Sequence, residues 1–195
     1  MGKEIEAKFF IEEKDSMRKN LKKLQLNLIK EEFLMKRKCF HSNEAGYKWM
    51  RVRDEGDKIT MTFKEITSNG INGVEEIEIE VNDFFNACEL IKKTNYFEVS
   101  YQETLREIWR NNEVEIVIDT WPFLQPYIEI EAESEEIVRK YSKLLNFDFE
   151  KDASFGGVAI LYNKAFGIPQ KEVNDAPIVT FEEKSFEKLL NSYKK

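Results

Sequence analysis

Two pairs of glutamates, each pair separated by one residue, are the side chains of this sequence best suited to bind a metal ion. Glu4 and Glu6 lie in the segment EIEAKFF, and Glu129 and Glu131 lie in YIEIEAE. Residues two apart in a strand point to the same side, so each pair presents two carboxylates together. Hard cations such as Mg2+ prefer carboxylate oxygens. One such strand alone is typical of a solvent-exposed face, and the second pair favours a metal site.

Basic side chains with the same spacing are suited to bind phosphate. Arg51 and Arg53 share one side of WMRVRDE, and a guanidinium can donate two hydrogen bonds to one phosphate group. Lys8 and Lys64 would contribute compact charges to other phosphate oxygens, although lysines at a sheet edge also guard against aggregation. Arg106, in ETLREIW, adds a third basic strand. Together with the glutamates, these residues suit a divalent cation that bridges a bound polyphosphate.

Two further acidic positions have competing interpretations. Asp119 ends the segment EIVID before TWPF, where it either caps the turn or contacts a metal ion or its water. Glu78 lies among alternating glutamates in EEIEIEV, which would repel one another inside a protein unless each has a basic partner. Glu78 is therefore a candidate only. The sequence contains neither a glycine-rich phosphate loop nor a nucleotide-binding fingerprint of the Rossmann type.

These residues require a sheet whose charged sides converge on one interior. Polar and apolar residues alternate with period two in eight segments, which predicts a closed, eight-stranded antiparallel β-barrel. The predicted strands lie near residues 3–11, 33–40, 48–54, 57–66, 74–82, 100–110, 113–119 and 127–133. Helical spacing of apolar residues predicts helices after Asp15, Asp83 and Ser134, and a fourth at about 182–193. The predicted class is α+β, with the helices packed outside the barrel.

Composition limits the other classes of protein. The 195 residues contain no repeat or linker, so we expect one domain over 1–195, with 168–195 as a C-terminal helix or tail. No apolar run reaches the ~18 to 20 residues that span a bilayer, and the N-terminus lacks a secretory signal, which predicts a cytoplasmic protein without a membrane partner. A net charge of −7 disfavours nucleic acid as a partner. One histidine and two cysteines exclude a multi-histidine metal site and a disulfide framework.

The ordered set of motifs resembles the CYTH superfamily, also called triphosphate tunnel metalloenzymes. This superfamily includes class IV adenylate cyclases, thiamine triphosphatases and inorganic triphosphatases. The resemblance covers about residues 3–133, and its motifs are Glu4-Ile5-Glu6-Ala7-Lys8, Arg51-Val52-Arg53, Thr62-Phe63-Lys64, the acidic strand 75–80, Arg106, Asp119 and Glu129-Ile130-Glu131. The ordered set is much more specific than its first motif.

The resemblance implies roles for these residues inside an antiparallel tunnel. The ligands of Mg2+ or Mn2+ that the resemblance implies are Glu4, Glu6, Glu129 and Glu131, and Asp119 is a further metal candidate from its position in the sequence. The expected contacts of the triphosphate are Lys8, Arg51, Arg53, Lys64 and Arg106. The expected catalytic residues are Glu6, Glu131 and Lys8, with Glu131 or a second metal positioning water. Relatives often carry a Lys or Tyr where this chain has 153–157, ASFGG, so one phosphate or leaving-group contact stays unassigned.

Three functions follow from this pattern. The first is a metal-dependent phosphohydrolase of inorganic triphosphate or a small organic triphosphate such as thiamine triphosphate. The second is a class IV-type adenylate cyclase that converts ATP to cyclic AMP and pyrophosphate; bacterial relatives often carry a His-Phe pair before Glu-x-Glu, and only three residues precede Glu4 here, which lowers this expectation. The third is a non-catalytic sensor of polyphosphate or nucleotide. A homodimer is left open by the sequence.

Overall fold

The computed structural model describes residues 2–42, 48–66 and 74–193, with the side chains of 2–4, 66 and 74 outside the description. Ten strands are found in this part of the chain: β1 Gly2–Glu4, β2 Glu6–Phe10, β3 Asn27–Ser42, β4 Lys48–Asp54, β5 Ile59–Ile66, β6 Val74–Val81, β7 Tyr96–Arg110, β8 Val114–Thr120, β9 Tyr127–Ala132 and β10 Ile178–Val179. The helices of the same part are α1 Lys14–Lys23, α2 Phe84–Lys92, α3 Glu135–Leu144, α4 Phe149–Asp152, α5 Ala159–Phe166, α6 Gln170–Asn174 and α7 Lys184–Tyr193.

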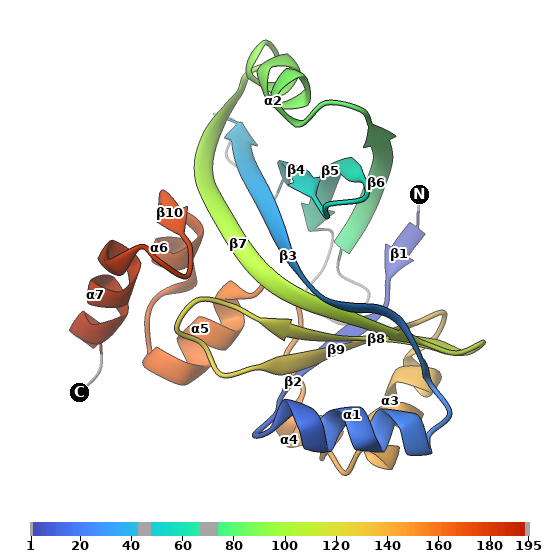
Figure 1. The fold of residues 1–195 in the computed structure, drawn as a ribbon. Coiled ribbons are helices and arrows are strands. Elements are labelled where there is room, and N and C mark those ends of the chain that lie inside the picture. The colour runs from blue at the N-terminus through green and yellow to red at the C-terminus, as the bar shows by residue number, and fades with distance from the viewer. Residues whose placement is uncertain (1, 43–47, 67–73, 194–195) are drawn as a thin grey trace.

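The strands form one sheet that curls into a half-barrel (Figure 1). Its order is β1-β6-β5-β4-β3-β7-β8-β9-β2, with antiparallel neighbours throughout, and the short β10 pairs in parallel with β7. The eight predicted strands and the α+β class are confirmed, because β1 and β2 together occupy the first predicted segment. Closure into a complete barrel is not confirmed.

The N-terminal segment explains why the sheet has this shape. Only Ile5 separates β1 from β2, yet β1 pairs with β6 and β2 pairs with β9, at opposite ends of the strand order. Residues 2–10 therefore contact both ends of the curled sheet. The Ile5 carbonyl accepts a hydrogen bond from the Ala132 N–H at 3.1 Å, which continues the β2–β9 pairing past the break.

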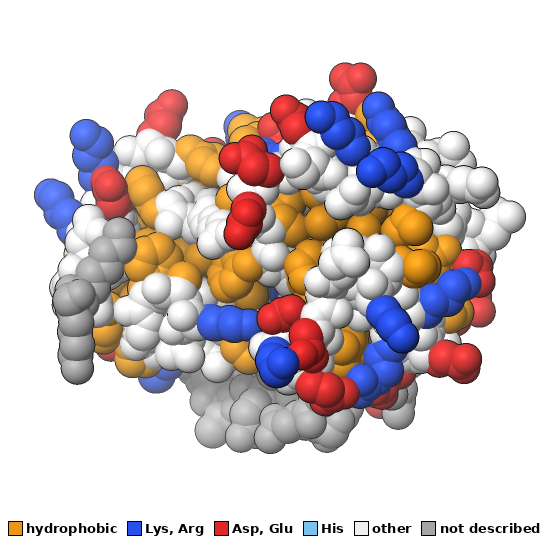
Figure 2. Space-filling view, turned by 90° about the horizontal axis from the view of Figure 1, so that it is seen from below, with side chains coloured by type: hydrophobic (Ala, Val, Ile, Leu, Met, Phe, Trp, Pro, Cys, Tyr) orange, Lys and Arg blue, Asp and Glu red, His pale blue; other side chains and the backbone are white. Residues whose placement is uncertain are grey.

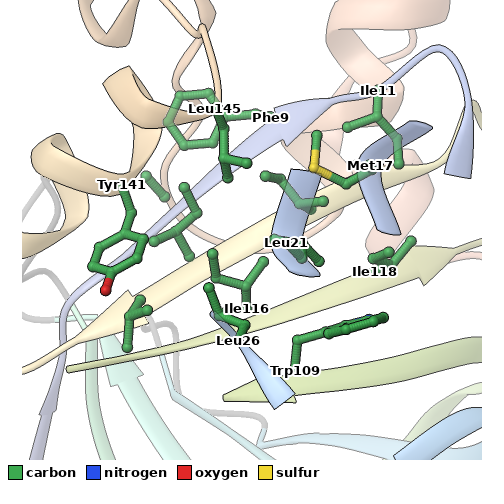
Figure 3. Packing of buried hydrophobic residues seen from close by; sticks show 14 of the residues in the cluster. Phe9, Ile11, Met17, Leu21, Leu26, Trp109, Ile116, Ile118, Tyr141 and Leu145 are labelled. Carbon is green, nitrogen blue, oxygen red and sulfur yellow. The ribbon is translucent and has the colours of Figure 1, made fainter. Parts of the chain in front are cut away.

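The period-two alternation separates an apolar side of β2 and β9 from a charged side. Ala7 and Phe9 of β2 are fully buried, as are Ile128 and Ile130 of β9. Together with β8, these strands form a hydrophobic layer covered by α1 and α3, which lie below them in Figure 1. Figure 3 shows this packing, with Phe9, Ile116, Ile118 and Trp109 from the sheet facing Met17 and Leu21 of α1 and Tyr141 and Leu145 at α3.

Two smaller hydrophobic clusters hold α2, α5, α6 and α7. The first joins α5, α6 and α7 to the end of the β8–β9 hairpin, where Tyr162 and Phe186 pack with Trp121 and Tyr127. The second places α2 against the outer side of β3 and β4 through Phe40 and Val52. Of these helices, α2 lies on the outer side of the sheet, whereas Ala159 of α5 and Gln170 and Asn174 of α6 border the space on its concave side.

The helix predictions were confirmed where a cap residue is well defined. Asp83 caps α2 by accepting from the Asn86 N–H at 2.8 Å, and Ser134 caps α3 by accepting from the Ile137 N–H at 3.3 Å. The predicted cap Asp15 was wrong, because α1 begins at Lys14 and Asp15 instead accepts a hydrogen bond from Arg18. The fourth helix is α7, whereas α4, α5, α6 and β10 were not predicted.

The outer surface carries charges of both signs. On the face shown in Figure 2, acidic and basic side chains are interspersed around hydrophobic ones. Within the described ranges, no helix combines the length and the apolar character needed to cross a bilayer.

Candidate active site

The concave side of the sheet encloses a central cavity of about 900 Å3. Its walls come from strands β2 to β9, and the segment from Gly156 to α6 lies at one side of it. Ser154 holds this segment against β2 by exchanging two backbone hydrogen bonds with Lys8, at 2.9 and 3.0 Å. The charged side chains of the sheet therefore converge on one space.

Three glutamates gather where β2 meets β9. Glu6 lies opposite Glu131 in the strand register, and carboxylate oxygens of Glu6, Glu129 and Glu131 lie within 4.8 Å of one another. This is the one group of potential metal ligands found among the described residues. Three convergent oxygen donors fit a divalent cation of the Mg2+ type, which binds through a few carboxylates together with phosphate or water oxygens. The side chain of Glu4, the other expected ligand, lies outside the described residues.

Lys8 lies within the same group of glutamates. Its side chain is 5% exposed and pairs with Glu6, and its Nζ lies 3.2 Å from Glu129 Oε2. Burial would lower the pKa of Lys8, but Glu129 and Glu6 outweigh burial and hold this pKa above its usual value. Lys8 is therefore a permanent cation. We call Glu6, Glu129, Glu131 and Lys8 the acidic wall.

Asp119 is buried in the cavity wall and forms an ion pair with Arg106. Arg106 donates to it through Nε at 2.7 Å and Nη2 at 2.6 Å, and the Tyr127 hydroxyl donates to it at 3.3 Å. Asp119 is 1% exposed and does not belong to the carboxylate group above. Arg106 also lies 3.9 Å from Glu129 and thus links Asp119 to the acidic wall. The structure places Asp119 where it can orient Arg106.

Arginines dominate the opposite wall. Arg51 and Arg53 of β4 point into the cavity, and both approach Glu78 of β6, with Nη2 to Oε2 distances of 3.4 and 3.5 Å. Burial, together with Arg51 and Arg106, lowers the pKa of Arg53 to about 9. Burial alone would raise the pKa of Glu78, but Arg53 and a hydrogen bond from the Thr62 hydroxyl at 2.8 Å hold it below its usual value.

Lys64 of β5 lies on the same wall and pairs with Glu76 at 2.8 Å. The structure therefore brings the expected phosphate contacts Lys8, Arg51, Arg53, Lys64 and Arg106 to one cavity. It also gives Glu78, which was only a candidate, a position between two arginines.

Arg37 was missed by sequence reasoning. It lies on β3, lines the cavity and is 7% exposed. Lys36, Arg37 and Lys38 are three consecutive basic residues, so the alternation of polar and apolar residues does not predict which side of the sheet Arg37 is on. Its neighbours two residues away, Met35 and Cys39, are apolar, so the rule that places charged residues on the cavity side gave no local signal for Arg37. We call Arg37, Arg51, Arg53 and Lys64 the basic wall.

Comparisons with known proteins agree with this geometry. A family model described as the CYTH domain matches residues 2–150. A protein of Methanocaldococcus jannaschii named "Putative adenylate cyclase MJ0240" is 29% identical over 145 residues, which cover 70% of this chain and 81% of that protein.

Solved structures share the fold. Protein PH1012 from Pyrococcus horikoshii OT3 superposes with a TM-score of 0.67 at 23% identity, over 77% of this chain and 94% of that chain. HpAC1 from Hippeastrum, described as an adenylyl cyclase candidate that reveals a dominant triphosphatase activity, superposes with a TM-score of 0.55 at 17% identity, over 86% and 99%.

Proposed function

Because this chain belongs to the CYTH family, we propose that it is a divalent-metal-dependent enzyme that hydrolyses inorganic triphosphate or a small organic triphosphate. The observation that carries this proposal is the pair of walls of opposite charge facing one cavity. The acidic wall gathers three carboxylates within 4.8 Å, and the basic wall presents Arg51, Arg53 and Lys64. A triphosphate complexed with a metal ion carries both charges that these walls would bind.

The residues would act mainly by position and charge. Phosphoryl transfer requires alignment of the reacting groups and neutralisation of developing charge more than covalent chemistry by the protein. Glu6, Glu129 and Glu131 would hold Mg2+ or Mn2+, which supplies Lewis-acid activation and charge neutralisation when bound. Arg51 and Arg53 would hold phosphate oxygens through their guanidinium N–H groups.

Lys8 and Glu131 would have different tasks beside the metal. The raised pKa of Lys8 keeps it protonated, so Lys8 would stabilise negative charge on the phosphate and would not act as a base. Glu131 is the exposed member of the carboxylate group, whereas Glu6 and Glu129 are partly buried. We therefore infer that Glu131 would orient an attacking water and accept its proton.

Adenylate cyclase activity is the second candidate. The observation in its favour is the 29% identity to the Methanocaldococcus jannaschii protein, whose name contains that activity. The same walls would then hold the triphosphate of ATP, while the ribose 3′-hydroxyl would attack the α-phosphate and expel pyrophosphate. The fold accommodates hydrolysis as well, because HpAC1 shares it and is described with a dominant triphosphatase activity.

A product assay tests both candidates. The purified protein would be incubated with tripolyphosphate, thiamine triphosphate or ATP, each with Mg2+ or Mn2+ and each with chelator. We expect metal-dependent release of phosphate, and the rates would rank the substrates. Cyclic AMP together with pyrophosphate would select the cyclase instead. Tight binding without either product would leave a non-catalytic sensor and reject both enzymatic functions.

A further inference from the structure

Within the part of the chain that the structure describes, Arg37 differs from the other cations of the central cavity in having no acidic partner. Every other lysine or arginine that lines the cavity has a carboxylate oxygen within 4 Å. These paired cations are Lys8, Lys48, Arg51, Arg53, Lys58, Lys64 and Arg106. Among the described residues, no carboxylate comes that close to Arg37. Its guanidinium is therefore a buried charge without a directly paired carboxylate in this part of the chain, and the more distant Asp119 offsets burial and the neighbouring arginines only in part.

The neighbours of Arg37 hold it in one orientation. On β3 it lies opposite Arg53 of β4 and Gln102 of β7 in the strand register. Its Nη2 donates to the Thr104 hydroxyl, and its guanidinium carbon lies 4.7 Å from the centre of the Trp121 ring. Stacking on an indole and a single hydroxyl contact fix the plane of a guanidinium and leave other N–H groups available.

Several buried donors near Arg37 lack an acceptor within the described residues. Arg37 Nε has no hydrogen-bond partner there, and neither has Trp121 Nε1, which belongs to the ring on which Arg37 stacks. Arg51 Nε is in the same situation, and Arg51 lies close enough to repel Arg37. Buried N–H groups without an acceptor cost free energy, so a set of them on residues that line one cavity indicates a site for an acceptor-rich ligand.

The local charge indicates the sign of that ligand. Burial, followed by the nearby charges of Arg51 and Arg106, lowers the pKa of Arg37 to about 10. These effects all disfavour the cation, and an anion at the guanidinium would oppose each of them. Removing one partner of a buried charge pair lowers the stability of the fold strongly. A buried charge that has no partner in the folded protein lowers its stability for the same reason.

We propose that Arg37, oriented by Thr104 and Trp121, is an additional anion subsite of the cavity and binds a phosphoryl oxygen of the substrate. This inference rests on the proposed function in so far as the anion is part of a triphosphate. Arg37 would add the N–H donors of a third guanidinium to those of Arg51 and Arg53. It lies on the part of the cavity wall where β3 pairs with β7. Thr104 and Trp121 would be positioning residues that act through Arg37.

Calorimetric titration with tripolyphosphate in the presence of EDTA tests the subsite without turnover. We expect Arg37→Gln to bind about 10- to 100-fold more weakly than the wild-type protein, which is the range for a lost hydrogen bond between charged groups. Lys38→Gln is the matched control, because Lys38 is adjacent on β3, does not line the cavity and pairs with Glu98 at 3.0 Å. Equal affinity in Arg37→Gln and Lys38→Gln would overturn the proposal, as would absence of binding by the wild-type protein.

Two further variants separate binding from a purely structural role. Arg37→Lys keeps the charge but loses the planar fork, so its affinity should lie between those of the wild type and Arg37→Gln. Thr104→Val removes the hydroxyl at similar volume and should weaken binding about 2- to 10-fold. Should Arg37→Gln fail to fold, Thr104→Val decides, and unchanged affinity in that variant refutes the subsite.

The outcome is independent of the hydrolase proposal. Tight binding of tripolyphosphate without turnover in Mg2+ would remove the hydrolase and leave the subsite standing. Turnover by the wild type, together with wild-type affinity in Arg37→Gln, would support the hydrolase and refute the subsite. Thermal unfolding adds a second measurement, because tripolyphosphate should raise the melting temperature of the wild type and of Lys38→Gln by more than that of Arg37→Gln.

Discussion

The acidic and basic walls line the same cavity, and each has an excess of charge of the opposite sign to the other. On the acidic wall, three carboxylates share one lysine, Lys8. On the basic wall, Glu78 is approached by two arginines, and Arg37 has no acidic partner within the described residues. One wall thus has an excess of negative charge and the other an excess of positive charge. The difference indicates that the ligand brings a cation to one side and an anion to the other.

The largest expected effect is on the acidic wall. Glu6→Gln keeps the shape of the side chain but removes one charge from the carboxylate group. Because a bound metal contributes several kcal/mol to stabilising the transition state, we expect metal-dependent phosphate release to fall by about 100-fold or more. Initial rates over a range of Mg2+ and Mn2+ concentrations measure this.

The control for Glu6→Gln is Glu135→Gln, which changes a surface glutamate that pairs with Arg139 on α3. Both variants should unfold at nearly the wild-type temperature, and only Glu6→Gln should lose activity. Unchanged rates and unchanged metal dependence in Glu6→Gln would refute the metal site of the acidic wall.

Lys8→Met tests how the acidic wall holds its charge. Burial favours the neutral form of Glu129, but Lys8 and Arg106 hold its pKa below the ordinary value of about 4.3. Glu129 therefore stabilises the fold above that pH, and its contribution is lost as the pH falls below it. Without Lys8 the pKa of Glu129 rises toward or above that value, so acidification should remove less stability from the variant than from the wild type.

We expect Lys8→Met to lower the free energy of unfolding by about 3 kcal/mol near neutral pH, since it breaks a buried pair. Thermal unfolding followed by circular dichroism from pH 3 to pH 8 measures both effects. A variant whose stability changes with pH in parallel with the wild type would show that Lys8 does not control Glu129.

Arg51→Gln is the corresponding change on the basic wall. We expect the KM for tripolyphosphate to rise about 10- to 100-fold, because a charged hydrogen-bond donor to phosphate is lost. The Mg2+ concentration that gives half-maximal activity should stay within about twofold of the wild type. Steady-state kinetics with each component varied in turn measures the two quantities. A variant that changes metal dependence as strongly as KM would break the distinction between the walls.

The smallest effect is expected at Glu78, and it has the opposite sign. Glu78 lies within 3.5 Å of Arg51 and Arg53, where it competes with phosphate for the same donors. Glu78→Gln should tighten binding of tripolyphosphate by about 2- to 5-fold, as expected for removal of one partly exposed charge. Calorimetry with EDTA measures this, and weaker binding would instead show that Glu78 orients the arginines.

Where polar and apolar residues alternate regularly, the sequence was sufficient to predict the structure. In EIEAKFF and YIEIEAE the alternating residues Ala7, Phe9, Ile128 and Ile130 are buried, and the cavity is lined by Glu6, Lys8, Glu129 and Glu131. The charged residues of β4 and β5 follow the same rule. Period two therefore predicted which side chains share a side of the sheet, and the curvature of the sheet brings those sides together.

Where alternation fails, the prediction failed as well. In β3 the polar and apolar residues do not alternate at Lys36, Arg37 and Lys38, so the sequence did not predict that Arg37 points into the cavity. The segment of α5, AILYNKAF, is apolar around most of its circumference because it packs between the β8–β9 hairpin and α7, and it therefore lacks the stripe that identifies a surface helix. Closure of the sheet depends on pairing between distant strands, which no local pattern specifies.

The break at Ile5 has a consequence for the order in which the protein matures. The carboxylate group forms only when the first residues of the chain pair with β9, more than half the chain away in sequence. Contacts between residues so far apart in sequence form late in folding, because closing a long loop costs chain entropy before the stabilising contacts are made. A chain emerging from synthesis would expose Glu6 long before Glu129 and Glu131 exist, so the ability to capture a metal ion would report that the N-terminal strand has reached its final place.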